Sequence, residues 1–187
     1  MINFALFPTA LGDCGIAWRD DMVVATRLPG ETSADIRRQM AARTGGKEAA
    51  PPGEIARAIT EITALLDGEA ADLSKIPCDL SRVDPFAAKV YDATRAIPAG
   101  QTSTYGAIAV QLGDKTLARN VGQALGRNPV PIIVPCHRVV GAGGKLVGFS
   151  ADGGVETKLK MLAIEGAALG EPPGLFDTLP LATKPRH

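Results

Sequence analysis

The chain has 187 residues, 45% of them hydrophobic, which suffices for one large domain or two small ones. Lysine and arginine (20) balance aspartate and glutamate (20), which argues against a generally basic nucleic-acid coat. Three scattered cysteines and two histidines, without a CxxC pair, predict neither a disulfide framework nor a metal site. No apolar run has membrane-spanning length and no signal peptide pattern opens the chain, so we expect a cytoplasmic protein.

The first half has the pattern of a small α+β domain. Residues 1–29 alternate short apolar runs with turn signals, which predicts paired strands in a short antiparallel sheet. Thr32 or Ser33 can cap a helix to about residue 43, and a second amphipathic helix is expected from Pro52 to Leu66. We predict a supporting domain over 1–84, of which 70–84 is a linker.

The second half begins with helical signals. Asp84-Pro85 is a typical helix start, and the helix is expected to stop before Pro98. Two short helices follow at 104–112, capped by Ser103 or Thr102, and at 116–126. Together they fit a helix-turn-helix or an ordinary helical hairpin. Arg119 favours the former, because early residues of the second helix reach nucleic acid in that motif.

Residues 128–140 read Asn-Pro-Val-Pro-Ile-Ile-Val-Pro-Cys-His-Arg-Val-Val. Three prolines favour turn or extended backbone before Cys136. The neighbouring His137 and Arg138 could favour the nucleophilic thiolate, although a cysteine after an apolar run is more often a small buried hydrophobe. Adjacent side chains seldom face one another, so Cys136 and His137 should communicate through a turn or a water.

The remaining segments frame this stretch. We expect Val139-Val140 to form a hairpin with residues 145–149, followed by a polar loop at 150–154 beside a pocket. A last helix is predicted from 155 to 165, and 167–187 is expected to be a proline-rich tail. Glu165, at the end of that helix, is a candidate for orienting His137, but spacing alone does not select it.

The string at 128–140 closely resembles the active-site signature of the O6-alkylguanine-DNA alkyltransferases, or methylated-DNA-protein-cysteine methyltransferases, and the resemblance runs from about residue 86 to 166. It implies an α+β protein whose helical domain, 85–166, carries a helix-turn-helix. The implied activity is stoichiometric transfer of an alkyl group from O6-alkylguanine, and from O4-alkylthymine, in double-stranded DNA to Cys136. No cofactor and no obligate protein partner are implied, and the protein is expected to be a monomer.

The resemblance also assigns roles to residues. Cys136, His137 and Glu165 match a catalytic relay through water, and the nucleotide is rotated out of the duplex. Arg119 matches an arginine that fills the gap left by the base. The other predicted DNA-binding or substrate-binding positions are Tyr105 beside the rotated nucleotide, Asn128 bracing the turn, Arg138, and Ser150 and Lys158 at the pocket edge. The charge is distributed accordingly, with net −4 over 1–85 and net +4 over 86–166.

Two departures from the family pattern concern the pocket. Phe149 replaces a common tyrosine, and the loop at 151–154 is two residues longer than in the best-known members. Three other functions are considered. One is a non-catalytic lesion-binding module, which Cys136 argues against. A thiol hydrolase would need a distant histidine, and only His187 is available. A helix-turn-helix regulator would leave the cysteine string without a purpose.

Overall fold

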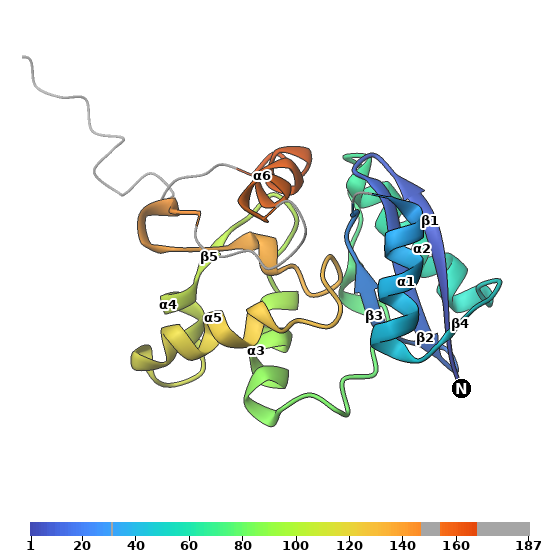
Figure 1. Cartoon of the computed structure of the whole chain (residues 1–187). Coiled ribbons are helices and arrows are strands. Elements are labelled where there is room, and N and C mark those ends of the chain that lie inside the picture. The colour runs from blue at the N-terminus through green and yellow to red at the C-terminus, as the bar shows by residue number, and fades with distance from the viewer. Residues whose placement is uncertain (31, 147–153, 168–187) are drawn as a thin grey trace, which may run out of the picture.

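The computed structural model describes residues 1–30, 32–146 and 154–167. Figure 1 shows a lobe built on a sheet beside a lobe of helices. The first lobe contains β1 (Ile2–Thr9), β2 (Gly12–Arg19), β3 (Met22–Arg27), α1 (Ser33–Thr44), β4 (Lys47–Glu48), α2 (Gly53–Leu66) and a 3₁₀ turn (Leu73–Lys75). The second contains α3 (Pro85–Arg95), β5 (Ser103–Thr104), α4 (Tyr105–Gln111), α5 (Ala118–Gly126), β6 (Val139–Val140) and α6 (Gly154–Ile164), with 3₁₀ turns at Lys115–Leu117, Cys136–Arg138 and Ala142–Gly144. The α+β class is confirmed.

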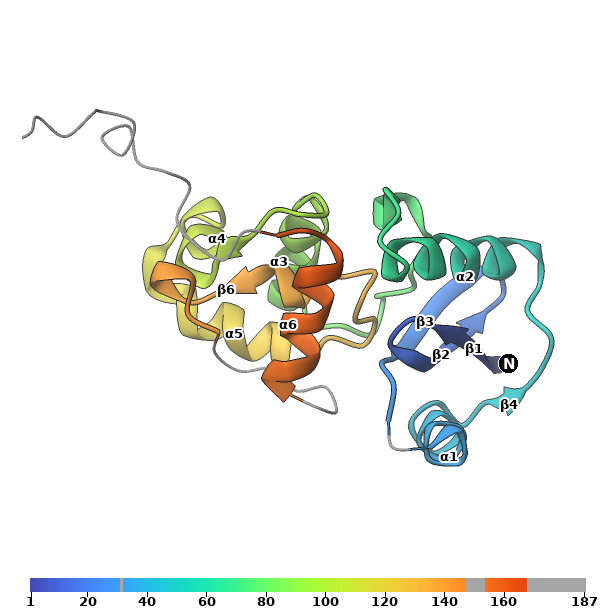
Figure 2. The ribbon, with the colours of Figure 1, turned by 90° about the horizontal axis from the view of Figure 1, so that it is seen from above.

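The sheet has the order β3-β2-β1-β4. The antiparallel pairing predicted for residues 1–29 is confirmed, but the two-residue edge strand β4 lies parallel to β1 and was not predicted. Strand side chains alternate between two faces. In β2, Ile16 belongs to the core that includes α2, whereas Ala17 belongs to a smaller cluster with Ile36 and Met40 of α1. The two helices therefore cover opposite faces of the sheet (Figure 2).

Helix starts follow their capping residues. The Thr32 hydroxyl accepts a hydrogen bond from the Asp35 amide at the start of α1, and Asp84 caps α3 as predicted. Helix α3 ends at Arg95, before the predicted stop. Helix α4 is capped by Thr104 rather than Ser103 or Thr102, and α5 begins at Ala118, later than predicted, because a 3₁₀ turn precedes it. A helix-turn-helix role for α4 and α5 stays a prediction.

The predicted hairpin is wrong, because Val139-Val140 forms a strand with a different partner. Strand β6 pairs in parallel with β5, so its partner comes from the segment before α4. A 3₁₀ turn follows β6, closed by a hydrogen bond of 2.7 Å from the Gly141 amide to the Lys145 carbonyl. Residues 147–149 of that hairpin, Ser150, the 151–153 part of the loop and the tail from 168 lie outside the described residues.

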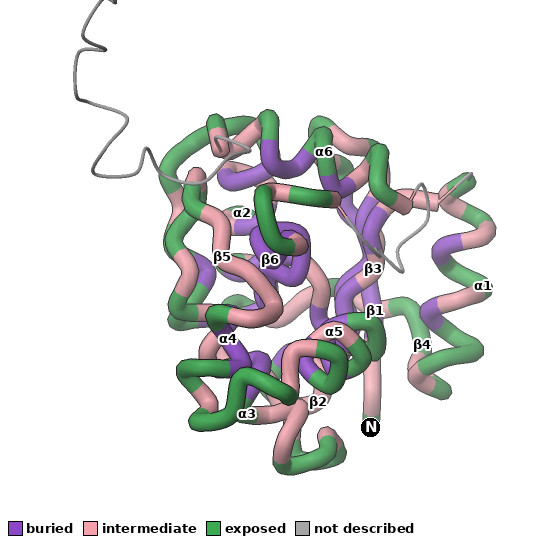
Figure 3. The backbone as a smooth tube through the Cα atoms, turned by 90° about the vertical axis from the view of Figure 1, so that its left-hand side faces the viewer, coloured by how far each residue is buried: buried purple, intermediate pink, exposed green. Residues whose placement is uncertain are grey.

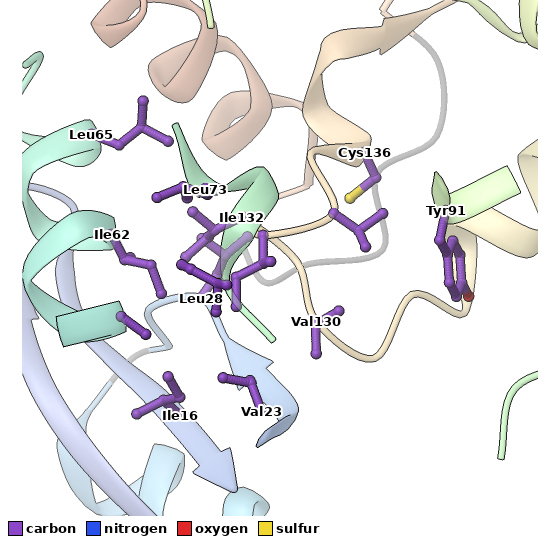
Figure 4. Close-up of a cluster of buried hydrophobic side chains, with 14 of the residues drawn as sticks. Ile16, Val23, Leu28, Ile62, Leu65, Leu73, Tyr91, Val130, Ile132 and Cys136 are labelled. Atoms are coloured by element: carbon purple, nitrogen blue, oxygen red, sulfur yellow. The ribbon is translucent and has the colours of Figure 1, made fainter. Parts of the chain in front are cut away.

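The two lobes share one hydrophobic core. Val23 and Leu28 from the sheet lobe cluster with Val130, Ile132 and Ile133 from the other (Figure 4). In Figure 3, residues of β3 in the sheet lobe and residues around β6 in the other lobe are both coloured as buried. The 1–84 and 85–166 division therefore describes two units in close contact, and their independence stays a prediction. Across the described residues, no helix is both long and apolar enough to cross a membrane.

Candidate active site

The side chain of Asn128 closes the turn before the cysteine. The Asn128 Oδ1 atom accepts from the Val130 amide at 3.0 Å, while its Nδ2 donates to the Val134 carbonyl at 2.8 Å. Within this turn Ile132 has φ 78°, in the left-handed region that a β-branched residue rarely adopts. Such strain persists only where the surroundings fix it. Here Ile132 is 1% exposed, and the two Asn128 bonds close the turn around it.

Strand β3 supports the same turn from the other lobe. The Thr26 amide donates to the Pro129 carbonyl at 3.0 Å, and the Thr26 hydroxyl donates to the Pro131 carbonyl at 2.5 Å. Both bonds satisfy carbonyls of partly buried residues, and a carbonyl left without a partner there costs free energy. The sheet lobe thus completes the segment that presents Cys136.

Cys136 is the first residue of the 3₁₀ turn that follows, and it is only 9% exposed. Figure 4 shows its sulfur at the margin of the shared core. Burial raises the pKa of the Cys136 thiol, and the nearby Asn128 amide and Lys158 ammonium oppose this only in part. The resting cysteine is therefore a thiol at neutral pH, and any nucleophilic reaction needs a base.

His137 is the base that the geometry supplies. Its imidazole is fully buried, and Nε2 lies 2.9 Å from Glu165 Oε1. Burial lowers the pKa of His137, although the Glu165 carboxylate opposes the shift, so the ring is neutral at pH 7. A neutral ring that donates from Nε2 to a carboxylate keeps Nδ1 as its acceptor. Among the described residues, Nδ1 has no hydrogen-bond partner, so it is available for a proton.

Glu165 is held by three different groups. Its side chain is 2% exposed, and Gly100 donates its amide to Oε2 at 3.3 Å. Burial alone would raise the carboxyl pKa, but the hydrogen bonds and charges of His137 and Arg138 outweigh it and lower the pKa to about 2. Gly100 has φ 77°, and an added Cβ would lie 3.0 Å from the Glu165 carbonyl oxygen, so no larger residue fits without a shift.

The side chain of Arg138 is engaged within the protein, and its contact with DNA stays a prediction. Its Nε and Nη2 atoms donate to the two oxygens of Glu165 at 2.9 and 2.8 Å, and Nη1 donates to the Ile97 carbonyl at 2.6 Å. The residue is 6% exposed. Because a forked guanidinium matches a carboxylate in its plane, Arg138 fixes the rotamer of Glu165. We therefore describe Arg138 as a positioning residue.

The lowered Glu165 pKa predicts acid sensitivity. The carboxyl pKa is about 2 in the folded protein against an ordinary 4.5, so the ionised form stabilises the fold above about pH 4.5 and this stability is lost as the pH falls toward 2. Linkage gives a loss on the order of 3 kcal/mol in the free energy of unfolding. Urea unfolding between pH 7 and pH 3, an interval that covers about 2 kcal/mol of this loss, should show a larger loss in wild type and in E156Q, which replaces an exposed carboxylate, than in E165Q. An equal pH dependence in E165Q would contradict this assignment.

Lys158 also lies deeper than predicted. It was expected at a pocket edge, but it is fully buried and donates to the Val139 carbonyl at 2.6 Å. Its ammonium lies 5.9 Å from the centre of the Tyr105 ring, within the range of a cation–π contact. Burial lowers the pKa of Lys158, while the adjacent Cys136 opposes this. A cation beside the sulfur favours the thiolate once it forms.

Two predicted residues lie at the start of neighbouring helices. Tyr105 begins α4 and is half-buried, and burial together with Cys136 raises its phenol pKa, so the hydroxyl remains a donor. Arg119 is exposed in the first turn of α5. Ser150 lies outside the described residues. In the described ranges, no group of three or more histidine, cysteine, aspartate or glutamate residues could hold a metal ion.

Sequence reasoning missed Thr26 and Gly100. Thr26 lies 105 residues from Pro131, and a threonine inside a strand pattern carries no signal of such a contact. The sequence Pro98-Ala99-Gly100 indicates only the end of a helix, so it gives no sign that Gly100 contacts Glu165. The inward direction of Arg138 had a weak signal, since an arginine between two buried stretches needs a buried anion as partner.

Known proteins resemble this chain in sequence and in fold. The family model described as the 6-O-methylguanine DNA methyltransferase, DNA binding domain, matches residues 85–167. A Mycolicibacterium paratuberculosis methylated-DNA-protein-cysteine methyltransferase is 38% identical over 88% of this chain and 93% of its own. A crystal structure of Mycobacterium tuberculosis OGT in complex with DNA is similar with TM-score 0.73 and 34% identity, over 88% of this chain and 92% of that chain. The chain therefore belongs to the methylated-DNA-protein-cysteine methyltransferase family.

Proposed function

We propose that the protein repairs DNA by transferring an alkyl group from O6 of an alkylated guanine to Sγ of Cys136. The observation that carries the proposal is the arrangement of a buried thiol next to a neutral His137, whose Nε2 is engaged by Glu165 at 2.9 Å. The match to a DNA-binding domain and the similarity to a relative crystallised with DNA support duplex DNA as the substrate.

The reaction needs one proton transfer and one displacement. His137 Nδ1 takes the proton of Cys136, through a water because adjacent side chains do not face one another, and Glu165 stabilises the imidazolium. The thiolate then attacks the alkyl carbon, an S–C bond forms and the bond from carbon to O6 breaks. The electron pair stays on the guanine, which takes up a proton as it leaves. Since a thioether has no easy route back to a thiol, each molecule reacts once, without a cofactor.

Access to the base requires the nucleotide to rotate out of the duplex, at a cost of a few kcal/mol. We assign the compensating contacts to α4 and α5 acting as a helix-turn-helix. Arg119, exposed at the start of α5, fills the gap in the stack, and Tyr105 lies beside the rotated nucleotide near Cys136. O4 of an alkylated thymine presents similar chemistry and belongs to the proposed range.

The supporting residues have separate tasks in this proposal. Asn128 braces the turn that carries Cys136, and Lys158 fixes the Val139 carbonyl after it. Arg138 holds Glu165. Ser150 remains a proposed contact at the pocket edge. Residues 85–166 form the unit that binds DNA and accepts the alkyl group, residues 1–84 support it, and the protein acts as a monomer in the cytoplasm.

The intact mass of the protein tests the proposal. After mixing with a duplex that contains O6-methylguanine, we expect a gain of one CH2 unit, and peptide mapping should place it on Cys136. An unmodified duplex of the same sequence should give no gain. Tight binding to the alkylated duplex without any gain would instead support a non-catalytic lesion-binding module, and neither binding nor gain would overturn the function.

A further inference from the structure

A cavity of about 650 Å³ lies between the two lobes, away from Cys136. Its wall on the sheet lobe includes parts of β3, the end of α1 and the segment before α3, and its wall on the other lobe includes α3 and one side of α5. Four arginines line it, namely Arg19, Arg43, Arg82 and Arg127. Two come from the sheet and α1, one from the connecting segment, and one from the end of α5.

The acidic residues of this cavity are already engaged. Asp79 forms an ion pair with Arg19 and accepts from the Ser81 amide at 3.0 Å. Asp84 accepts from the amides of Phe86 and Ala87 as the cap of α3. Neither carboxylate is therefore available to neutralise the other arginines that line the wall.

Three of the arginines lack an anionic partner. Within the ranges that the structure describes, the guanidinium groups of Arg43, Arg82 and Arg127 form no hydrogen bond and no ion pair, and all three residues are exposed. Arginine side chains presented in a concave site are well suited to bind phosphate.

The cavity continues the exposed surface of α5. Arg119 and Gln123 of α5 and its C-cap residue Arg127 follow one another at intervals of four residues, so they form one strip from the first turn of the helix to its end. All three are exposed. The strip is about 12 Å long at 1.5 Å per residue. This length is on the order of the width of a DNA groove. When the first turn of such a helix lies in the groove, its last turn therefore lies near the phosphates at the groove edge.

We propose that this cavity binds the phosphate backbone of the duplex flanking the alkylated nucleotide, through Arg127 of α5 together with Arg82 and Arg43 of the sheet lobe and connecting segment. The inference rests on the proposed binding of DNA by α5. It adds a contact that residues 85–166 alone do not make, because the first lobe then holds DNA directly. Phosphate contacts position a protein without reading sequence, so this site should act equally on alkylated and unmodified DNA.

The test is the salt dependence of DNA affinity for the full chain. We would compare wild type, R82Q, R127Q and the double variant, with R57Q as the control, since Arg57 is exposed on α2 and pairs with Glu54. The duplexes, with and without O6-methylguanine, should extend about 10 base pairs on each side of the central position. Each lost phosphate contact should reduce the slope of log K against log salt by about 0.9. R82Q and R127Q should each show this reduction on both duplexes, and R57Q should match wild type.

Three results would overturn the proposal. The slope could stay at the wild-type value in R82Q and R127Q, or it could fall in R127Q alone, which would leave the first lobe without a contact. In the third result, inorganic phosphate raises the Tm of wild type but not of the double variant, while the slopes of log K against log salt for DNA are equal in the two proteins. The cavity would then be a site for free phosphate. Alkyl transfer from free O6-benzylguanine, which has no phosphate, should be equal in all variants. Failure of wild type to gain mass from alkylated DNA would count against the proposed function and leave the binding slopes interpretable.

Discussion

C136A should accept no alkyl group and should still bind alkylated DNA. Removing this thiol removes the sulfur to which we assign the S–C bond, so the mass gain after incubation with an O6-methylguanine duplex should vanish. The side chain is small and the site is 9% exposed, so the fold and the DNA contacts of α5 should persist. Intact mass and a binding titration with the same duplex measure the two properties separately.

C78A is the matched control for this variant. Cys78 is half-buried, and burial raises its thiol pKa to about 11, so the thiol is not ionised at neutral pH. In the sequence, it also has no histidine next to it, unlike Cys136. C78A should gain mass as wild type does. A C136A protein that still gained one CH2 unit, or a C78A protein that did not, would contradict the assignment of Cys136 as acceptor.

E165Q should react much more slowly and should be less stable. Without the carboxylate, His137 loses the group that orients it and stabilises its charged form, so the alkylation rate constant should fall by roughly 10²- to 10⁴-fold. Arg138 would then keep a buried charge without its ionic partner, which typically costs about 3–5 kcal/mol. The rate should be measured with free O6-benzylguanine, which isolates the chemistry from DNA binding, and the stability by urea unfolding at pH 7.

Two further variants separate these effects. E156Q changes a glutamate of α6, the helix that ends just before Glu165, and the Glu156 side chain is 75% exposed, so the rate and stability of this variant should stay close to wild type. The double variant E165Q/R138M removes the uncompensated cation, so it should regain much of the stability but none of the rate. Recovery of both together would mean that Glu165 acts only through the fold.

Local patterns predicted most of the fold. Strand alternation over 1–29, the caps at Thr32 and Asp84 and the spacing of Ile36 with Met40 are local signals, and the structure follows them. Strands β4, β5 and β6 have two residues each, which is too short for any period to show. The hairpin prediction failed for this reason, because Val139-Val140 found a partner some 36 residues earlier in the chain.

The chemistry of the candidate site could be predicted from one string, but its supports could not. The Pro-Cys-His-Arg run identified Cys136 and His137, and resemblance supplied Glu165, which the structure places 2.9 Å from the imidazole. The directions of Arg138 and Lys158 depend on burial, and burial is set by tertiary packing. Arg138 was predicted to contact DNA or substrate and Lys158 to lie at a pocket edge, and both donate to oxygen atoms of the interior.

The bonds from Thr26 to the turn before Cys136 also bear on how the chain is assembled. They join segments about 105 residues apart, so closing the turn requires a long loop to be ordered first. During synthesis the amino-terminal part leaves the ribosome first and domains tend to fold as they emerge. The strand that carries Thr26 can therefore be in place as a template when the turn is made. A nascent chain acquires its reactive cysteine last, on a surface that already exists.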